Sequence, residues 1–133
     1  MVGIGVVVFR ADQVLLIRRG KPPRLGQWSL PGGLQELGET VFQAAVREVR
    51  EECAVAIEPI SIIDIVDAIT PDADGRVRFH YTLVEVLAEW RAGAPVAGDD
   101  AMDAAWFDPR DVGSLGMWEQ TTRIIAKGLA MRG

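Results

Sequence analysis

The feature that most constrains the fold is a change of hydrophobic period close to Thr40. Upstream, the runs GIGVVVF (residues 3–9) and QVLLIRR (13–19) are rich in β-branched residues and leucine, which predicts two strands joined by a tight connection. Between them and Thr40 lies a segment dense in glycine and proline, residues 20–33, which predicts a loop with a short extended piece at 28–30. Downstream, apolar residues recur at helical spacing. They are Phe42, Ala45, Val46, Val49 and Cys53.

The predicted helix carries a crowded set of carboxylates. Thr40 followed by Gln43 fits a capping box, so we expect the helix to begin there. Its residues, about 100° apart, divide into three sectors. We expect a stripe around Phe42, Val46 and Val49 to face the core, Arg47 and Arg50 to lie on one side of it, and Glu48, Glu51 and Glu52 to converge on the other. Like charges at this spacing cost a few tenths of a kcal/mol per pair, so the crowding needs an explanation.

The rest of the chain predicts a mixed sheet covered by helices. It contains two strands with a turn between them, a loop, a short strand and a closing helix. These are expected at 60–69 and 77–90 around the turn 70–76, then at 92–100, 103–107 and 117–131. Strands before and after a central helix indicate the α/β class, with the sheet sandwiched between helices. A chain of 133 residues suits a single domain, residues 1–133.

Composition excludes several classes of function. The net charge of −5 leaves no basic surplus for a nucleic-acid backbone, but a divalent cation can still bridge an acidic protein to a small phosphorylated ligand. The single cysteine, Cys53, excludes an internal disulfide framework, continues the apolar stripe and is expected to be inert. No apolar run is long enough to span a bilayer. We therefore expect a cytoplasmic protein that binds neither nucleic acid nor membranes.

The carboxylates of the predicted helix have two readings. Acids on a helix face are most often simply solvated, but three converging glutamates also suit a hard cation such as Mg²⁺ or Mn²⁺. The preceding loop favours the second reading. From Gly33 the chain gives glycine, five residues, Glu39, seven residues and REVREECAV, which resembles the Nudix box at every specified position except Ala54, where the box has glycine. That glycine ends the helix in a left-handed conformation, which costs alanine about 1 kcal/mol.

The resemblance implies roles for individual residues. Members of the Nudix family bind divalent metal through the box glutamates, here Glu48, Glu51 and Glu52, often with the carbonyl of the glycine before the box, here Gly32. Glu39 and Arg47 resemble the pair that braces the loop against the helix. The general base varies in the family: Glu51 or Glu52 is the first choice here, and Glu119 or an acid of GDDAMD (98–103) is an outside candidate.

The substrate is left open among three readings. Family members cleave a nucleoside diphosphate linked to another group, and Pro71, 16 residues after Val55, matches a marker of ADP-ribose pyrophosphatases, although a turn proline explains it equally. Tyr81 lies too far along to be the diadenosine-polyphosphate marker. The alternatives are a nucleoside-triphosphate pyrophosphatase, in which Asp99 and Asp100 would read the base, and a non-catalytic nucleotide-binding domain. A homodimer is one assembly we consider.

Other candidate substrate contacts lie upstream of the box. Arg18, Arg19, Lys21 and Arg24 form the basic cluster that could hold a distal phosphate, or could be a solvated strand end. Trp28 is expected to pack the loop on the core, with stacking on a base as the less favoured reading. His80 is expected to be structural.

Overall fold

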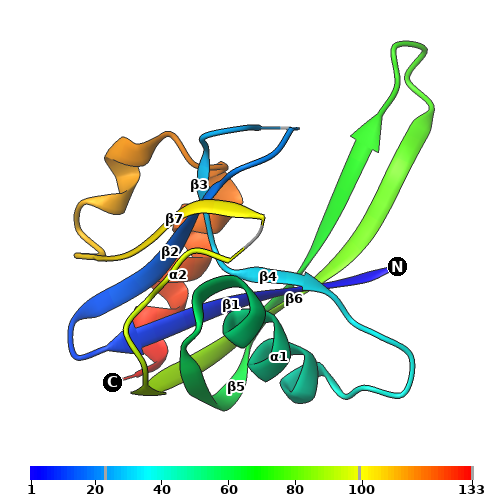
Figure 1. Cartoon of the computed structure of the whole chain (residues 1–133). Helices are drawn as coiled ribbons and strands as arrows, with labels where there is room; N and C mark the ends of the chain where they lie inside the picture. The colour runs from blue at the N-terminus through cyan, green and yellow to red at the C-terminus, as the bar shows by residue number, and fades with distance from the viewer. Residues whose placement is uncertain (23, 99, 133) are drawn as a thin grey trace.

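The computed structural model describes residues 1–22, 24–98 and 100–132, and in them a seven-stranded mixed sheet lies between two helices (Figure 1). The strands are β1 (Val2–Arg10), β2 (Gln13–Arg19), β3 (Trp28–Ser29), β4 (Gly32–Leu34), β5 (Ala56–Pro71), β6 (Val77–Ala92) and β7 (Ala101–Phe107). The helices are α1 (Val41–Cys53) and α2 (Glu119–Met131), with a short 3-10 helix η1 (Val112–Leu115) before α2. The expected α/β class is confirmed.

The first strand organises the sheet. The order is β3-β2-β1-β6-β5, with β4 also paired to β1 and β7 to β2. The pairing of β1 with β6 is parallel, and the other pairings are antiparallel. Alternate side chains of β1 enter two different cores. Ile4, Val6 and Val8 join the core under α1, and Val7 and Phe9 join the core under α2. Because β1 is buried on both faces, its sequence is a continuous apolar run and does not alternate between apolar and polar residues.

The central helix begins and ends where the sequence predicts. The Thr40 side chain accepts a hydrogen bond from the Gln43 backbone N–H, and the Gln43 side chain accepts one from the Thr40 N–H, which confirms the capping box. Ala54 takes the left-handed conformation (φ 59°, ψ 29°) that ends the helix. One prediction for the stripe is wrong: Phe42 is 38% exposed, and Ala44 is fully buried instead. The buried face of the helix therefore runs through Ala44, Ala45, Val49 and Cys53.

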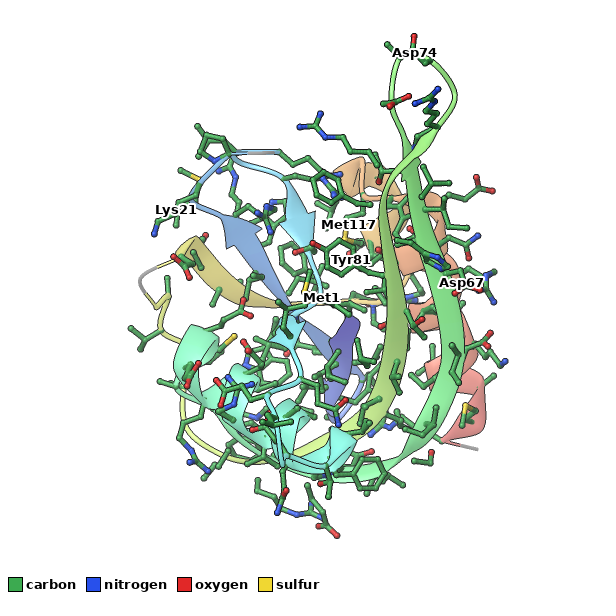
Figure 2. All side chains as sticks on the ribbon, turned by 90° about the vertical axis from the view of Figure 1, so that its right-hand side faces the viewer. Met1, Lys21, Asp67, Asp74, Tyr81 and Met117 are labelled. Carbon is green, nitrogen blue, oxygen red and sulfur yellow. The ribbon has the colours of Figure 1, made fainter. Side chains whose placement is uncertain are left out.

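Three other elements differ from the sequence prediction. The strand expected at 60–69 begins earlier, at Ala56, and the segment 32–34, expected as loop, pairs with β1 as β4. The short helix η1 was not predicted. The expected turn between β5 and β6 is present, because Asp72 Oδ1 accepts the N–H groups of Asp74 and Arg76. This hairpin projects beyond the sheet, with Asp74 at its tip (Figures 1 and 2). None of the described helices is long and apolar enough to cross a membrane.

Candidate functional site

The glutamates of α1 face the glycine strand β4. The Gly32 N–H donates a hydrogen bond of 3.0 Å to Glu52 Oε1. The carboxylate of Glu48 lies against Gly33 so closely that a Cβ at that position would collide with it. Gly32 and Gly33 pair with Gly5 and Ile4 of β1, so they are held at this distance by the sheet. Gly33 thus allows the β4 backbone to approach the Glu48 carboxylate directly, whereas a Cβ at Gly32 would instead collide with the Ile4 carbonyl of β1.

Arg47 joins the loop before α1 to the helix carboxylates. Its Nε and Nη2 donate to the two Glu39 carboxylate oxygens at 2.7 and 3.0 Å, and Nη2 also donates to the Leu34 carbonyl at 2.9 Å. Its Nη1 donates to Glu48 at 2.8 Å and lies 3.3 Å from Glu51. The prediction that Arg47 lies on the side of the helix away from the acids is wrong. The long side chain reaches back across the helix surface, which an angle of about 100° per residue at Cα does not capture.

Burial and the contacts with Arg47 shift the pKa values of the glutamates in this cluster. Burial raises the pKa of Glu52 to about 7, against the lowering effect of the Gly32 N–H. Burial also raises the pKa of Glu48, partly offset by Arg47. The hydrogen bond to Arg47 lowers the pKa of Glu39, and the same contact raises the pKa of Arg47. The braced pair therefore stays ionised, while desolvation favours protonation of the two glutamates nearest β4 in the metal-free protein.

The three glutamates open onto one cavity of about 670 Å³. Its other polar lining residues come from the strand ends and loops around β2 and β7: Arg19, Lys21, Ser29 and Asp100, with Gly32 and Gly33 on the floor. Lys21 Nζ lies 2.7 Å from Asp100 Oδ1. The cavity thus brings together the acids of α1 and part of the basic cluster that the sequence singled out. We call it the carboxylate cavity.

The donor chemistry of the carboxylate cavity fits a hard divalent cation, because carboxylate and carbonyl oxygens are the ligands Mg²⁺ prefers. Within residues 1–22, 24–98 and 100–132, no three acidic, histidine or cysteine side chains already surround one point. Glu48 is turned toward Arg47 and Glu52 toward Gly32. Glu51 has a 60% exposed side chain. All three glutamates nevertheless line the same cavity.

A second cavity, of about 690 Å³, adjoins the first and shares Arg19, Ser29, Leu30, Gly32 and Gly33 with it. Its lining is more apolar than that of the first, with Tyr81 of β6 and Met117 before α2 in it (Figure 2), but it also includes Arg24, Gln27 and Thr121. Its remaining lining includes Gly5, Leu83, Glu85 and Trp118. We call it the aromatic cavity. Glu85 was missed by the sequence analysis. An acid between Val84 and Val86, within the otherwise apolar run 83–88, was the signal for it.

The structure places only some of the predicted substrate-binding residues in the two cavities. Arg19 lines both cavities, Asp100 the carboxylate cavity and Arg24 the aromatic cavity. Four others line neither of the two. Arg18 donates to the Gly26 carbonyl at 2.8 Å, Trp28 packs edge-on against Phe107 at 4.8 Å between ring centroids, Pro71 ends β5 beside Val77, and Glu119 is an exposed first residue of α2. Asp99 lies outside the described residues.

Two further expectations concern residues without a chemical role. Cys53 is buried and unpaired by any disulfide, and burial raises its pKa to about 12, which keeps it an unreactive thiol. His80 Nε2 lies 3.1 Å from Asp67 Oδ1 across the β5–β6 hairpin, away from both cavities. The structural reading of each is consistent with these positions.

Comparison with known proteins points to one family. The family model of the NUDIX domain matches residues 1–128. The ADP-ribose pyrophosphatase of Methanocaldococcus jannaschii is 33% identical over 114 residues, which cover 86% of this chain and 65% of that protein. The 8-oxo-dGDP phosphatase of Homo sapiens is 39% identical over 104 residues, which cover 78% of this chain and 31% of that protein. The chain therefore matches less than two thirds of the length of either relative.

The fold agrees with the sequence comparison. The crystal structure of a MutT NUDIX hydrolase from Burkholderia pseudomallei superposes with a TM-score of 0.80 at 30% identity, and the match covers 95% of both chains. The two chains therefore share the fold over nearly their whole lengths.

Proposed function

Because this chain belongs to the Nudix hydrolase family, we propose that it is a divalent-metal-dependent hydrolase that cleaves the pyrophosphate of a nucleoside diphosphate linked to another group. The observation that carries the proposal is the carboxylate cavity, where Glu48, Glu51 and Glu52 share one lining with Arg19 and Lys21. A bound Mg²⁺ or Mn²⁺ would polarise the phosphoryl oxygens and lower the pKa of a water. Glu48, Glu52 and the Gly32 carbonyl are the groups we assign to hold it.

The residues of the chain itself would position the diphosphate. Arg19 and Lys21 supply positive charge in the same cavity as the acids, where they would contact phosphoryl oxygens. Glu39 and Arg47 would hold Glu48 and the strand β4 in place without touching substrate. Glu51 is the base we favour, because its side chain is exposed to the cavity while Glu52 is held by Gly32. Glu119 is a weaker candidate, since it lines neither cavity.

ADP-ribose is the substrate we propose first, with AMP and ribose 5-phosphate as products. The similarity to the archaeal ADP-ribose pyrophosphatase supports it. Pro71 adds nothing to this proposal, because it lies in the hairpin beyond both cavities. The size of the aromatic cavity, which adjoins the carboxylate cavity, suits a nucleoside placed beside a metal-held diphosphate.

A nucleotide-pool enzyme that acts on 8-oxo-dGDP or nucleoside triphosphates is the second candidate, favoured by the similarity to the human phosphatase. In the structure Asp100 pairs with Lys21 in the carboxylate cavity, so we no longer assign it to base reading. A silent nucleotide-binding domain is the least favoured reading, because it has no use for three cavity-facing glutamates.

A substrate panel tests the proposal. ADP-ribose, 8-oxo-dGDP and the common nucleoside triphosphates would be incubated with Mg²⁺ or Mn²⁺, and the products resolved by chromatography. We expect ADP-ribose to give the highest kcat/KM, and all hydrolysis to stop in EDTA and return with metal. A triphosphate or 8-oxo-dGDP preferred by tenfold, about 1.4 kcal/mol of transition-state binding, would favour the second candidate. Full activity in EDTA would overturn the metal mechanism.

A further inference from the structure

The floor of the aromatic cavity carries a buried acid that the proposed chemistry does not use. Glu85 is 6% exposed, and it is the one charged or polar residue of the described chain classed with the buried core. Its Oε2 atom is buried and has no hydrogen-bond partner among the described residues. A buried acceptor without a partner costs about 1–3 kcal/mol. Such a group in a cavity wall needs a reason other than folding.

The register of three strands aims this carboxyl into the cavity. Gly5 of β1 pairs with Glu85 on one side and with Gly32 of β4 on the other, so the three residues form a row across the sheet. The Glu85 carboxyl lies over Gly5, where any Cβ would collide with it. Leu83, two residues earlier on the same face, likewise covers Gly3. The glycines of β1 thus leave room for the carboxyl to extend across the strand toward the shared edge of the two cavities.

The groups assigned to the metal decide which part of a nucleotide would lie here. The aromatic cavity is lined by Arg19 and Arg24 as well as by Glu85, whereas Lys21 and the glutamates assigned to the metal lie only in the adjoining carboxylate cavity, where a bound cation would hold the diphosphate. The nucleoside end is therefore the part that suits the aromatic cavity. Apolar and aromatic side chains in the lining of this cavity suit a planar base. They are Leu30, Leu83, Met117, Tyr81 and Trp118.

We propose that Glu85 recognises the exocyclic amino group of a purine base, adenine first, in the aromatic cavity. This inference rests on the proposed nucleotide substrate and adds the residue that selects the base. A carboxyl oxygen of Glu85 would accept a hydrogen bond from the amino N–H, which would give the buried acceptor a partner. Burial raises the pKa of Glu85 to about 7, so the protonated form can also donate to the neighbouring ring nitrogen of adenine.

The test compares two ligands that differ by one amino group. AMP and purine riboside 5′-monophosphate, which lacks the 6-amino group, would be titrated calorimetrically into the full chain with Mg²⁺. We expect the wild type to bind AMP about tenfold more tightly, the size of one hydrogen bond of about 1.4 kcal/mol. Glu85→Leu should bind both ligands equally. Glu85→Gln keeps an acceptor and a donor in the same shape, so it should keep the preference for AMP.

A matched control uses Asp67, an exposed acid on β5 outside both cavities (Figure 2). Asp67→Leu should keep the tenfold preference. A preference lost in Glu85→Leu and kept in both Glu85→Gln and Asp67→Leu supports the inference. The wild-type comparison tests the inference even without a folded Glu85→Leu variant: equal binding of the two ligands by the wild type, or no binding of AMP, overturns the inference.

The outcomes separate this inference from the proposed function. If ADP-ribose is not hydrolysed but AMP binding depends on Glu85 as described, the choice of substrate is wrong and the base-recognition role stands. If ADP-ribose is hydrolysed while the two ligands bind equally, the proposed function stands and the role of Glu85 is wrong.

Discussion

The Glu39 carboxylate accepts two hydrogen bonds from the Arg47 guanidinium, at 2.7 and 3.0 Å, and so ties the loop before α1 to the middle of that helix. The same guanidinium holds Glu48 and the Leu34 carbonyl. One planar cation therefore fixes the relative positions of β4 and the helix carboxylates. Arginine is suited to this because its donors form a rigid fork that lysine lacks.

Arg47→Lys tests this bracing role. Lysine keeps the charge but cannot pair with both Glu39 oxygens while also reaching Glu48 and Leu34, so β4 and Glu48 should lose their fixed geometry. We expect kcat/KM to fall by about 10–100-fold, the range for residues that orient metal ligands, and the melting temperature to fall. Arg50→Lys, on an exposed position of the same helix, should change neither. Unaltered kinetics in Arg47→Lys would show that the bracing is not needed.

Glu52→Gln separates metal binding from folding. Glutamine keeps the acceptor for the Gly32 N–H but cannot ionise. Since the pKa of Glu52 rises from 4.5 unfolded to about 7 folded, the stability that this group contributes is fully present below about pH 4.5 and is lost as pH rises through 7. In EDTA, Glu52→Gln should therefore match the wild type near pH 4.5 and exceed it above pH 7, by on the order of 3 kcal/mol at most. Denaturant unfolding across this pH range measures the difference.

The activity of Glu52→Gln should move in the opposite direction. Removal of one assigned metal ligand should lower kcat by about 10³-fold or more, since the lost charge stabilisation is worth several kcal/mol. Glu36→Gln, at a side chain that is 67% exposed, is the control and should do little to either quantity. A Glu52→Gln protein that melts much lower in EDTA yet hydrolyses normally would make the acid structural.

Gly33→Ala tests the close approach of β4 to Glu48. The added methyl group would meet the Glu48 carboxylate, which can swing aside because it is the end of a flexible side chain. The fold should therefore survive while the carboxylate is displaced, and a displacement of about 1 Å lowers activity by about 10²-fold. Gly113→Ala, where a Cβ meets nothing within 4 Å, is the matched control. Equal kcat/KM for the two variants would remove the reason for a glycine at 33.

Ala54→Gly tests the position where the chain departs from the family box. Ala54 has φ 59°, a conformation that glycine adopts freely and alanine at about 1 kcal/mol. The variant should gain about this much stability and melt a few degrees higher, with kcat/KM unchanged, because Ala54 lines neither cavity. Ala126→Gly, inside α2, should melt lower for the opposite reason. A lower melting temperature for Ala54→Gly would contradict this account of the helix end.

The sequence by itself determined the features that depend on neighbours a few residues apart. The start of α1 follows from Thr40 and Gln43, and its end from the left-handed Ala54, because caps are satisfied within one turn. The spacing of Glu48, Glu51 and Glu52 likewise places all three along one cavity, since the helix period alone sets their relative positions.

Only the tertiary structure decided which distant residues meet those carboxylates. The row of Gly32, Gly5 and Glu85 depends on β1 pairing with β4 and, in parallel, with β6, which lies more than seventy residues further along the chain. That register follows from burying both faces of β1 under two helices, and no local pattern encodes it. The packing of Trp28 against Phe107, nearly eighty residues away, likewise depends on the tertiary structure. The local sequence therefore determines the carboxylate helix, and non-local strand pairing determines which residues lie next to it.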